Sequence, residues 1–162
     1  MTAPPPAGRD VVIGVGNEFK RDDNAGPAVV ARLRGLVPDG VDLLVSDGEP
    51  TRLIEAWDGA RIAVIVDAVR GEPAVPGRLH RMVLHEPGAG GGRAASSHGL
   101  GLDDAIGLAR VLGRVPGTLI LHAVEAADLS HGTGLTPAVA ATIDTLAAVV
   151  LWDFRGLGPQ FL

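Results

Sequence analysis

The run Val11–Asn17, which reads VVIGVGN, constrains the fold of this chain more than any other segment. Its apolar β-branched half is typical of a strand in a parallel sheet that is covered on both faces. Two glycines end the run, and the acidic pair Asp22 and Asp23 follows at the start of a stretch, 23–36, whose apolar residues have helical spacing. In an open α/β sheet, such a junction between the carboxyl end of a strand and the next helix is where ligands bind.

The other predicted elements alternate in the same way, which favours a single α/β domain with helices on both faces of a twisted sheet. Strands are predicted over 10–15, 41–45, 61–66, 78–84 and 118–124, and helices over 23–36, 51–57, 100–112 and 136–151. Thr51 and Thr136 are the expected N-caps of two of these helices. Residues 1–9 are interpreted as a disordered lead, 10–152 as the domain, and 153–162 as a tail.

One strand is expected to run against the others. The connection 68–77 contains two prolines and two glycines, and a parallel return needs a crossover of about a dozen residues or more. We therefore predict that the strand 78–84 is antiparallel.

Composition removes several classes of function. The net charge is −5 and no basic cluster is present, which argues against a nucleic-acid partner. The chain has no cysteine, so thiolate catalysis, cysteine-bound metals and disulfides are excluded. We find no signal peptide, and the apolar stretch 139–152 is too short for a membrane span and contains Asp144. A cytoplasmic protein without membrane contact is expected.

Asp23, Asp67 and His98 are the candidate metal ligands, because each is expected near the carboxyl end of a buried strand or just before a helix. Acidic residues also cap helices, but two adjacent carboxylates cannot both do so, and we expect Asp23 to be the free one. Two carboxylates and one imidazole suit Ni, Zn, Mn or Fe(II) better than Ca²⁺. For His98 to join Asp67, the glycine-rich segment 85–97 has to bring the chain back along the sheet, and its length permits this.

Simpler interpretations remain for several of these residues. His98 taken alone is typical of an ordinary histidine at a helix start, and Ser96 and Ser97 are expected to cap that helix. The other four histidines have no evident partner in the sequence and are interpreted as ordinary: His80, His85, His122 and His131. A dinucleotide-binding loop is disfavoured, because Phe19 stands where its third glycine belongs and the acidic pair would repel a pyrophosphate.

The motifs Gly14–Asn17 with Asp22–Asp23, Val66–Ala68 and Ser96–Gly99 together resemble those of the hydrogenase maturation proteases. The similarity runs from about Val11 to Leu151 in the same order. The resemblance implies one α/β domain with a mostly parallel five-stranded sheet. It also implies an endopeptidase that removes the C-terminal extension of a nickel-loaded [NiFe]-hydrogenase large-subunit precursor.

The resemblance implies that the metal-binding and catalytic positions of the family correspond to Asp23, Asp67 and His98. It also implies an aspartic-type, metal-binding endopeptidase. Nickel is presented by the substrate, and Zn or Cd is expected to replace it in a crystal. The metal either activates water or only positions the substrate tail, with Asp23 as general base. Asn17, Asp22 and Glu49 are the candidate substrate contacts, and a monomer is expected.

Two departures from the family pattern keep an alternative open. Asn24 follows the acidic pair where glycine is usual, and Glu49 stands in a segment that is usually Gly-Thr. A non-catalytic paralogue that docks a hydrogenase subunit as an assembly chaperone is the alternative function. A nucleotide-binding module is the third interpretation, and it predicts cofactor-dependent thermal stabilisation.

Overall fold

The computed structural model describes residues 8–88 and 100–155, which form a five-stranded sheet in the order β2-β1-β3-β5-β4. The strands β1 (Asp10–Val15), β2 (Val41–Ser46), β3 (Ile62–Val69) and β5 (Thr118–Glu125) run parallel to one another. The edge strand β4 (Leu79–His85) pairs antiparallel with β5. The short connection before β4 predicted this reversal, and the structure confirms it.

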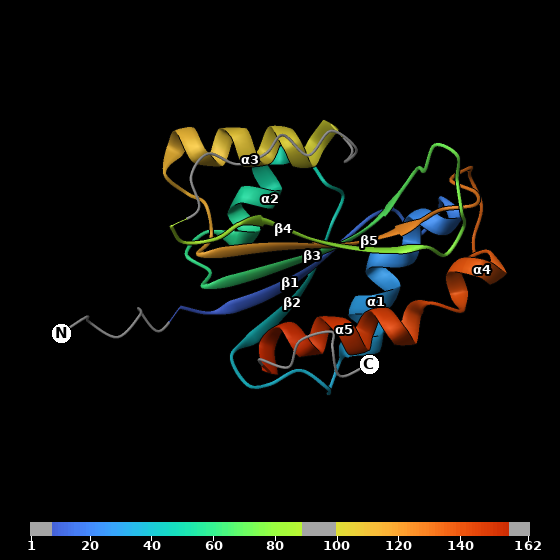
Figure 1. Ribbon diagram of the computed structural model, residues 1–162, viewed down its shortest axis with the longest axis horizontal. Coiled ribbons are helices and arrows are strands. Elements are labelled where there is room, and N and C mark those ends of the chain that lie inside the picture. Colours follow the sequence, from blue (N-terminus) through green and yellow to red (C-terminus); the bar gives the residue numbers. More distant parts are fainter. Residues whose placement is uncertain (1–7, 89–99, 156–162) are drawn as a thin grey trace.

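Helices cover both faces of the sheet, so the predicted three-layer α/β architecture is confirmed (Figure 1). One face packs against α2 (Pro50–Trp57) and α3 (Leu100–Leu112), and the other against α1 (Ala25–Leu33) and α5 (Ile143–Arg155). Two short elements complete the chain: the 3₁₀ turn η1 (Arg21–Asn24) and α4 (Pro137–Ala140). Each layer boundary therefore has a hydrophobic core of its own.

Alternation along the strands decides which core each side chain enters. On β3, Ile65 packs in the core under α2 and α3, whereas Val64 and Val66 pack in the core under α1 and α5. Asp67 follows in the same strand and has the parity of Ile65. It therefore lies on the α3 side of the sheet, two residues before β3 ends at Val69.

The predicted helix boundaries were wrong in three places, each for a local reason. The stretch 23–36 divides into η1 and α1, and α1 stops at Leu33. The stretch 136–151 divides into α4 and α5, and α5 continues to Arg155, past the expected end of the domain. The N-cap of α2 is Glu49 rather than Thr51, because the Glu49 carboxylate accepts hydrogen bonds from the backbone N–H groups of Thr51 and Arg52.

By length and composition, the segment Pro137–Arg155 would also suit a membrane-spanning helix, contrary to the expectation that no stretch of the chain does. It has 19 residues and a mean hydropathy of 1.4. In the fold, it forms α4 and α5, and its buried apolar side chains belong to the core under α1: Val139, Leu146, Ala147 and Val150. Length and apolar content are thus weak evidence for a membrane-spanning helix here, because a helix that packs in this hydrophobic core has the same properties.

Candidate active site

Close backbone packing brings η1 onto the carboxyl edge of the sheet. A Cβ atom on Gly26 would lie 2.4 Å from the carbonyl oxygen of Val66, and one on Gly16 would lie 1.7 Å from that of Asp23. Gly16 also has a φ of +151°, which L side chains rarely adopt. Only glycine fits at these two contacts, and the resulting approach places the acidic pair beside the ends of β1 and β3.

Asp23 is half-buried and is held by the loop that follows β1. Its Oδ2 atom accepts a hydrogen bond of 2.9 Å from the backbone N–H of Asn17. The Asn17 side chain in turn accepts one of 2.8 Å from the backbone N–H of Phe19. This loop therefore uses the N–H of Asn17 on a carboxylate of the same chain, where a dinucleotide-binding loop would offer it to a phosphate.

Asp67 is half-buried near the end of β3, and its pKa is raised to about 7. Burial is the main cause, because it disfavours the charged carboxylate, and the nearby negative charge of Asp23 acts in the same direction. Only a hydrogen bond from the backbone N–H of Ala68 works against these two effects. The structure thus brings Asp23 and Asp67 together as a pair of carboxylates that repel each other, which is the electrostatic environment that a bound cation relieves.

His98, the third predicted ligand, lies outside the described residues, so its place in the site stays a prediction. Ser96 and Ser97 lie there too, as does most of the connecting segment 85–97. Within residues 8–88 and 100–155, no group of three His, Asp or Glu side chains is arranged to hold a metal ion. The helix that follows His98, α3, packs on the face of the sheet to which Asp67 belongs.

Asp22 is fully buried, which contradicts the expectation that it contacts substrate. Its carboxylate accepts hydrogen bonds from the backbone N–H groups of Ala127, Asp128 and Thr136 and from the Thr136 hydroxyl. Burial acts to raise the pKa of Asp22, but these hydrogen bonds outweigh it and lower the pKa. The side chain is therefore an anchor that ties η1 to the segment between β5 and α4. Asp23 is the outward member of the pair, as expected.

Glu49 and Asn17 have structural roles that the sequence did not predict. Glu49 caps α2, and the hydrogen bonds from Thr51 and Arg52 lower its pKa. Asn17 orders the loop around Asp23, as described above. Contact of either residue with substrate remains a prediction.

Two histidines that were interpreted as partnerless have buried carboxylate partners. His80 lies 2.8 Å from Glu125, measured between Nε2 and Oε2, and His122 lies 2.6 Å from Asp153, between Nε2 and Oδ2. The backbone N–H of Val75 also donates to Glu125, which fixes the connection between β3 and β4 against the end of β5. No spacing in the sequence could have paired these residues, because 31 and 45 positions separate the partners.

Two hollows lie at this edge of the sheet. A groove of about 550 Å³ runs beside α1 and is lined by Gly16 and Asn17 of the loop that holds Asp23, and by Val45 of β2. A second hollow of about 450 Å³ lies between the segments 70–74 and 126–130, which continue β3 and β5. Open space therefore lies next to the loop that holds Asp23.

Comparison with known proteins identifies the family of this chain and agrees with its fold. The family model described as hydrogenase maturation protease matches residues 29–152. The hydrogenase 2 maturation protease of Escherichia coli (strain K12) is 31% identical over 154 residues, which are 94% of each chain. The hydrogenase expression/formation protein HupD of Rhodobacter capsulatus is 29% identical over 93% of this chain and 73% of its own.

Solved structures give the same result. The hydrogenase maturating endopeptidase HybD from E. coli superposes with a TM-score of 0.76 at 27% identity, over 93% of this chain and 94% of its own. The [NiFe] hydrogenase maturation protease HybD from Thermococcus kodakarensis matches in fold, with a TM-score of 0.66 at 21% identity, over 88% of this chain and 96% of its own. By sequence and by fold together, this chain belongs to the hydrogenase maturation proteases.

Proposed function

We propose that this chain is an endopeptidase that removes the C-terminal extension of a nickel-loaded [NiFe]-hydrogenase large-subunit precursor. Membership of the protease family supports the reaction class. The observation that carries the proposal in this chain is the pair Asp23 and Asp67, in which burial and, second, the nearby charge of Asp23 raise the pKa of Asp67 to about 7. Two such carboxylates, one of them bonded to Asn17 of the groove lining, suit a substrate that arrives with a divalent cation.

In this proposal, the nickel belongs to the substrate, and Asp23, Asp67 and His98 provide oxygen and nitrogen ligands for it. When it is bound, the metal supplies a positive charge that polarises a peptide carbonyl or anchors the tail. The hydrogen bond from Asn17 keeps the Asp23 carboxylate oriented toward the site. A carboxylate oriented in this way can take the proton of an attacking water, and we assign that role to Asp23. Zn or Cd would occupy the same ligands in a crystal, and the enzyme would act as a cytoplasmic monomer.

The docking paralogue loses part of its support. Glu49, one of its two sequence arguments, is accounted for by the capping of α2. Asn24, the other argument, lies in η1 and lines the groove. The protease proposal therefore explains more of this chain.

Mass spectrometry of the cognate precursor, with and without inserted nickel, tests the proposal. We expect loss of a C-terminal peptide only from the nickel-loaded precursor. Asp23→Asn and Asp67→Asn should each slow this processing by about 100-fold or more, since a general base or a metal ligand is lost. The matched control is Asp39→Asn, which changes an exposed carboxylate in the turn before β2 and should leave the rate unchanged. Normal processing by both site variants would refute the assigned roles.

A further inference from the structure

The groove beside α1 follows the helix from Asn24 to Arg34, so an extended peptide can lie along it. Its helical wall consists of residues that recur every three to four positions on one face of α1, among them Pro27, Ala28 and Ala31. These side chains are small, so a neighbouring chain can approach the helix closely. Phe19 and Val45, which are 60% and 54% exposed, provide large apolar surfaces at the other side.

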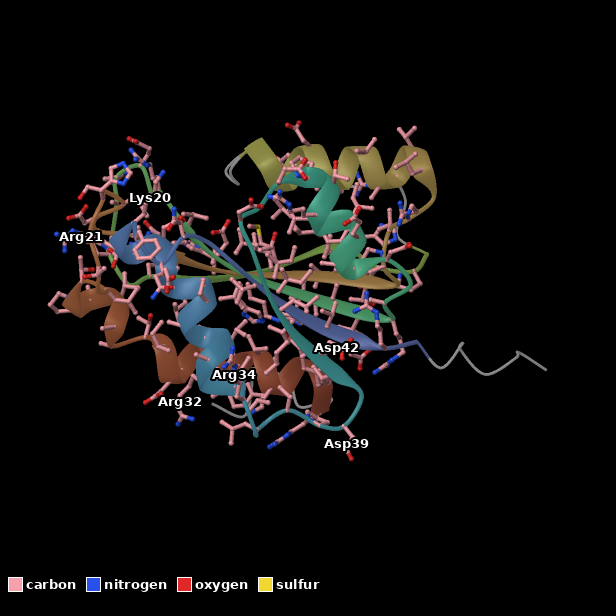
Figure 2. All side chains as sticks on the ribbon, turned by 180° about the vertical axis from the view of Figure 1, so that it is seen from behind. Lys20, Arg21, Arg32, Arg34, Asp39 and Asp42 are labelled. Carbon is pink, nitrogen blue, oxygen red and sulfur yellow. The ribbon has the colours of Figure 1, made fainter. Side chains whose placement is uncertain are left out.

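The two ends of the groove differ in charge. At one end lies Asn17, which is bonded to Asp23, and Glu18 stands beside it. At the other end lies Arg34, the residue that follows α1. Figure 2 shows Arg34 near Arg32 at the end of α1 that lies away from Lys20 and Arg21 of the η1 region. A segment that occupies the groove therefore meets a cation at the end away from the acidic pair.

Arg34 is available for a ligand, whereas its neighbour Arg32 is not. The Arg32 guanidinium donates a hydrogen bond of 2.8 Å to Asp144 on α5. Arg34 is exposed and makes no ion pair or side-chain hydrogen bond with the residues that the structure describes. Guanidinium groups bind carboxylates in a fork geometry, which makes a carboxylate the natural ligand here.

We propose that the groove binds the C-terminal extension of the substrate as an extended chain, and that Arg34 recognises a carboxylate on it. The inference rests on the proposed function and names a specificity residue for it. The distance from Asn24 to Arg34 along the helix is about 15 Å, which an extended peptide spans in about four or five residues. The recognised carboxylate, an acidic side chain or the chain terminus, therefore lies about that many residues beyond the bond that is cut.

Steady-state processing of the nickel-loaded precursor tests the role of Arg34. Arg34→Ala should raise KM about two- to fivefold, which lies within the range for one exposed ion pair, with little change in kcat. Arg34→Lys should recover part of this loss, because the charge returns without the fork. Arg32→Ala, in the last turn of α1 two residues before Arg34, is the matched control and should leave KM unchanged. Equal KM values for the wild type and Arg34→Ala would overturn the proposal.

The source of the carboxylate is found with altered substrates. If the acidic side chains of the extension are replaced by their amides and the wild type then behaves like Arg34→Ala, a side chain is recognised. If only a C-terminal amide on the extension has this effect, the chain terminus is recognised. If the difference between the two enzymes survives both changes, Arg34 does not bind a carboxylate and the proposal is wrong.

Photo-crosslinking separates failure of this inference from failure of the proposed function. A photoreactive amino acid at position 31 should crosslink to the extension, whereas one at Val111, which is 83% exposed on α3 at the opposite face of the sheet, should not. A docked extension crosslinks whether or not it is cut. Crosslinking without cleavage by the wild type would therefore contradict the protease function alone. Cleavage without crosslinking at position 31 would contradict the groove alone.

Discussion

Asp22 and Asp67 are carboxylates at the same edge of one sheet, yet their surroundings are opposite. Asp22 is fully buried, and donors from three other residues surround it, so its pKa is lowered. Asp67 is half-buried and receives only the Ala68 N–H, so burial and the charge of Asp23 raise its pKa to about 7. The difference lies in the number of hydrogen-bond donors and not in burial alone.

This contrast separates a carboxylate that holds the fold from one that is ready for a ligand. A buried charge with a full set of donors is stable as it stands and has no lone pair to offer. A buried charge without donors costs free energy until a proton or a cation neutralises it. Asp67, which has only the Ala68 N–H against burial and the charge of Asp23, is close to the second description.

Removal of the Asp22 carboxylate should have the largest effect on stability of the changes that test this contrast. Asp22→Ala should lower the free energy of unfolding by about 3–5 kcal/mol, because several buried N–H groups lose their acceptor at once. Asp23→Ala is the matched control, since it removes the adjacent, half-buried carboxylate with a single backbone partner and should cost about 1 kcal/mol or less. Urea denaturation of the two variants and the wild type measures both losses. Similar losses in the two variants would abolish the distinction between them.

The pH dependence of stability provides the second test. A pKa of about 7 in the folded state exceeds that of the unfolded state, so the folded protein binds the proton more tightly. The contribution of Asp67 to the stability of the metal-free protein is therefore fully present below the unfolded pKa and is lost as the pH rises through about 7.

Replacement of Asp67 isolates this contribution. Between pH 5 and pH 8, the wild type should lose about 1–2 kcal/mol more of its free energy of unfolding than Asp67→Asn does. Asp22 does not interfere in this window, because its pKa is lowered and it stays ionised. Parallel pH profiles of the two proteins would show that the pKa of Asp67 is not raised in the folded state.

The smallest effect is expected at Thr136. Its hydroxyl lies 2.8 Å from Oδ2 of Asp22, and Thr136→Val keeps the shape of the side chain while it removes this one donor. We expect a loss of about 1 kcal/mol in the free energy of unfolding, well below that of Asp22→Ala. Thr133→Val, at an exposed position of the same segment, should change stability by less than about 0.5 kcal/mol. A loss at Thr136 as large as that at Asp22 would mean that the hydroxyl alone stabilises the anchor.

Local patterns in the sequence were sufficient for the fold. The apolar run of β1 and the short, glycine- and proline-containing connection before β4 predicted the parallel core and its antiparallel edge. They succeed because burial on two faces and the length of a connection are properties of a few adjacent residues. The division of the last helix between Ala140 and Ile143 was missed, whereas Thr136 occupies the predicted N-cap position, with its hydroxyl bonded to Asp22 instead of to the helix backbone.

The site could be predicted only in part. Glycine spacing and the acidic pair pointed to Asp23, and the end of a buried strand pointed to Asp67. The anchoring role of Asp22 was not predictable, because its donors lie between 105 and 114 residues away in the chain. The pairs His80–Glu125 and His122–Asp153 were missed for the same reason, since only the folded chain brings their partners together.

The bonds to Asp22 also determine when during synthesis this protein becomes able to act. Asp22 and Asp23 emerge from the ribosome more than a hundred residues before Thr136 does. Until the segment 127–136 has been made, the Asp22 carboxylate lacks the donors that it has in the folded chain, and η1 lacks its tie to the segment between β5 and α4. Non-local contacts of this kind form late and slow the folding of a chain. A nascent copy is thus inactive until nearly all of its sequence has been made, which delays hydrolysis to the finished enzyme.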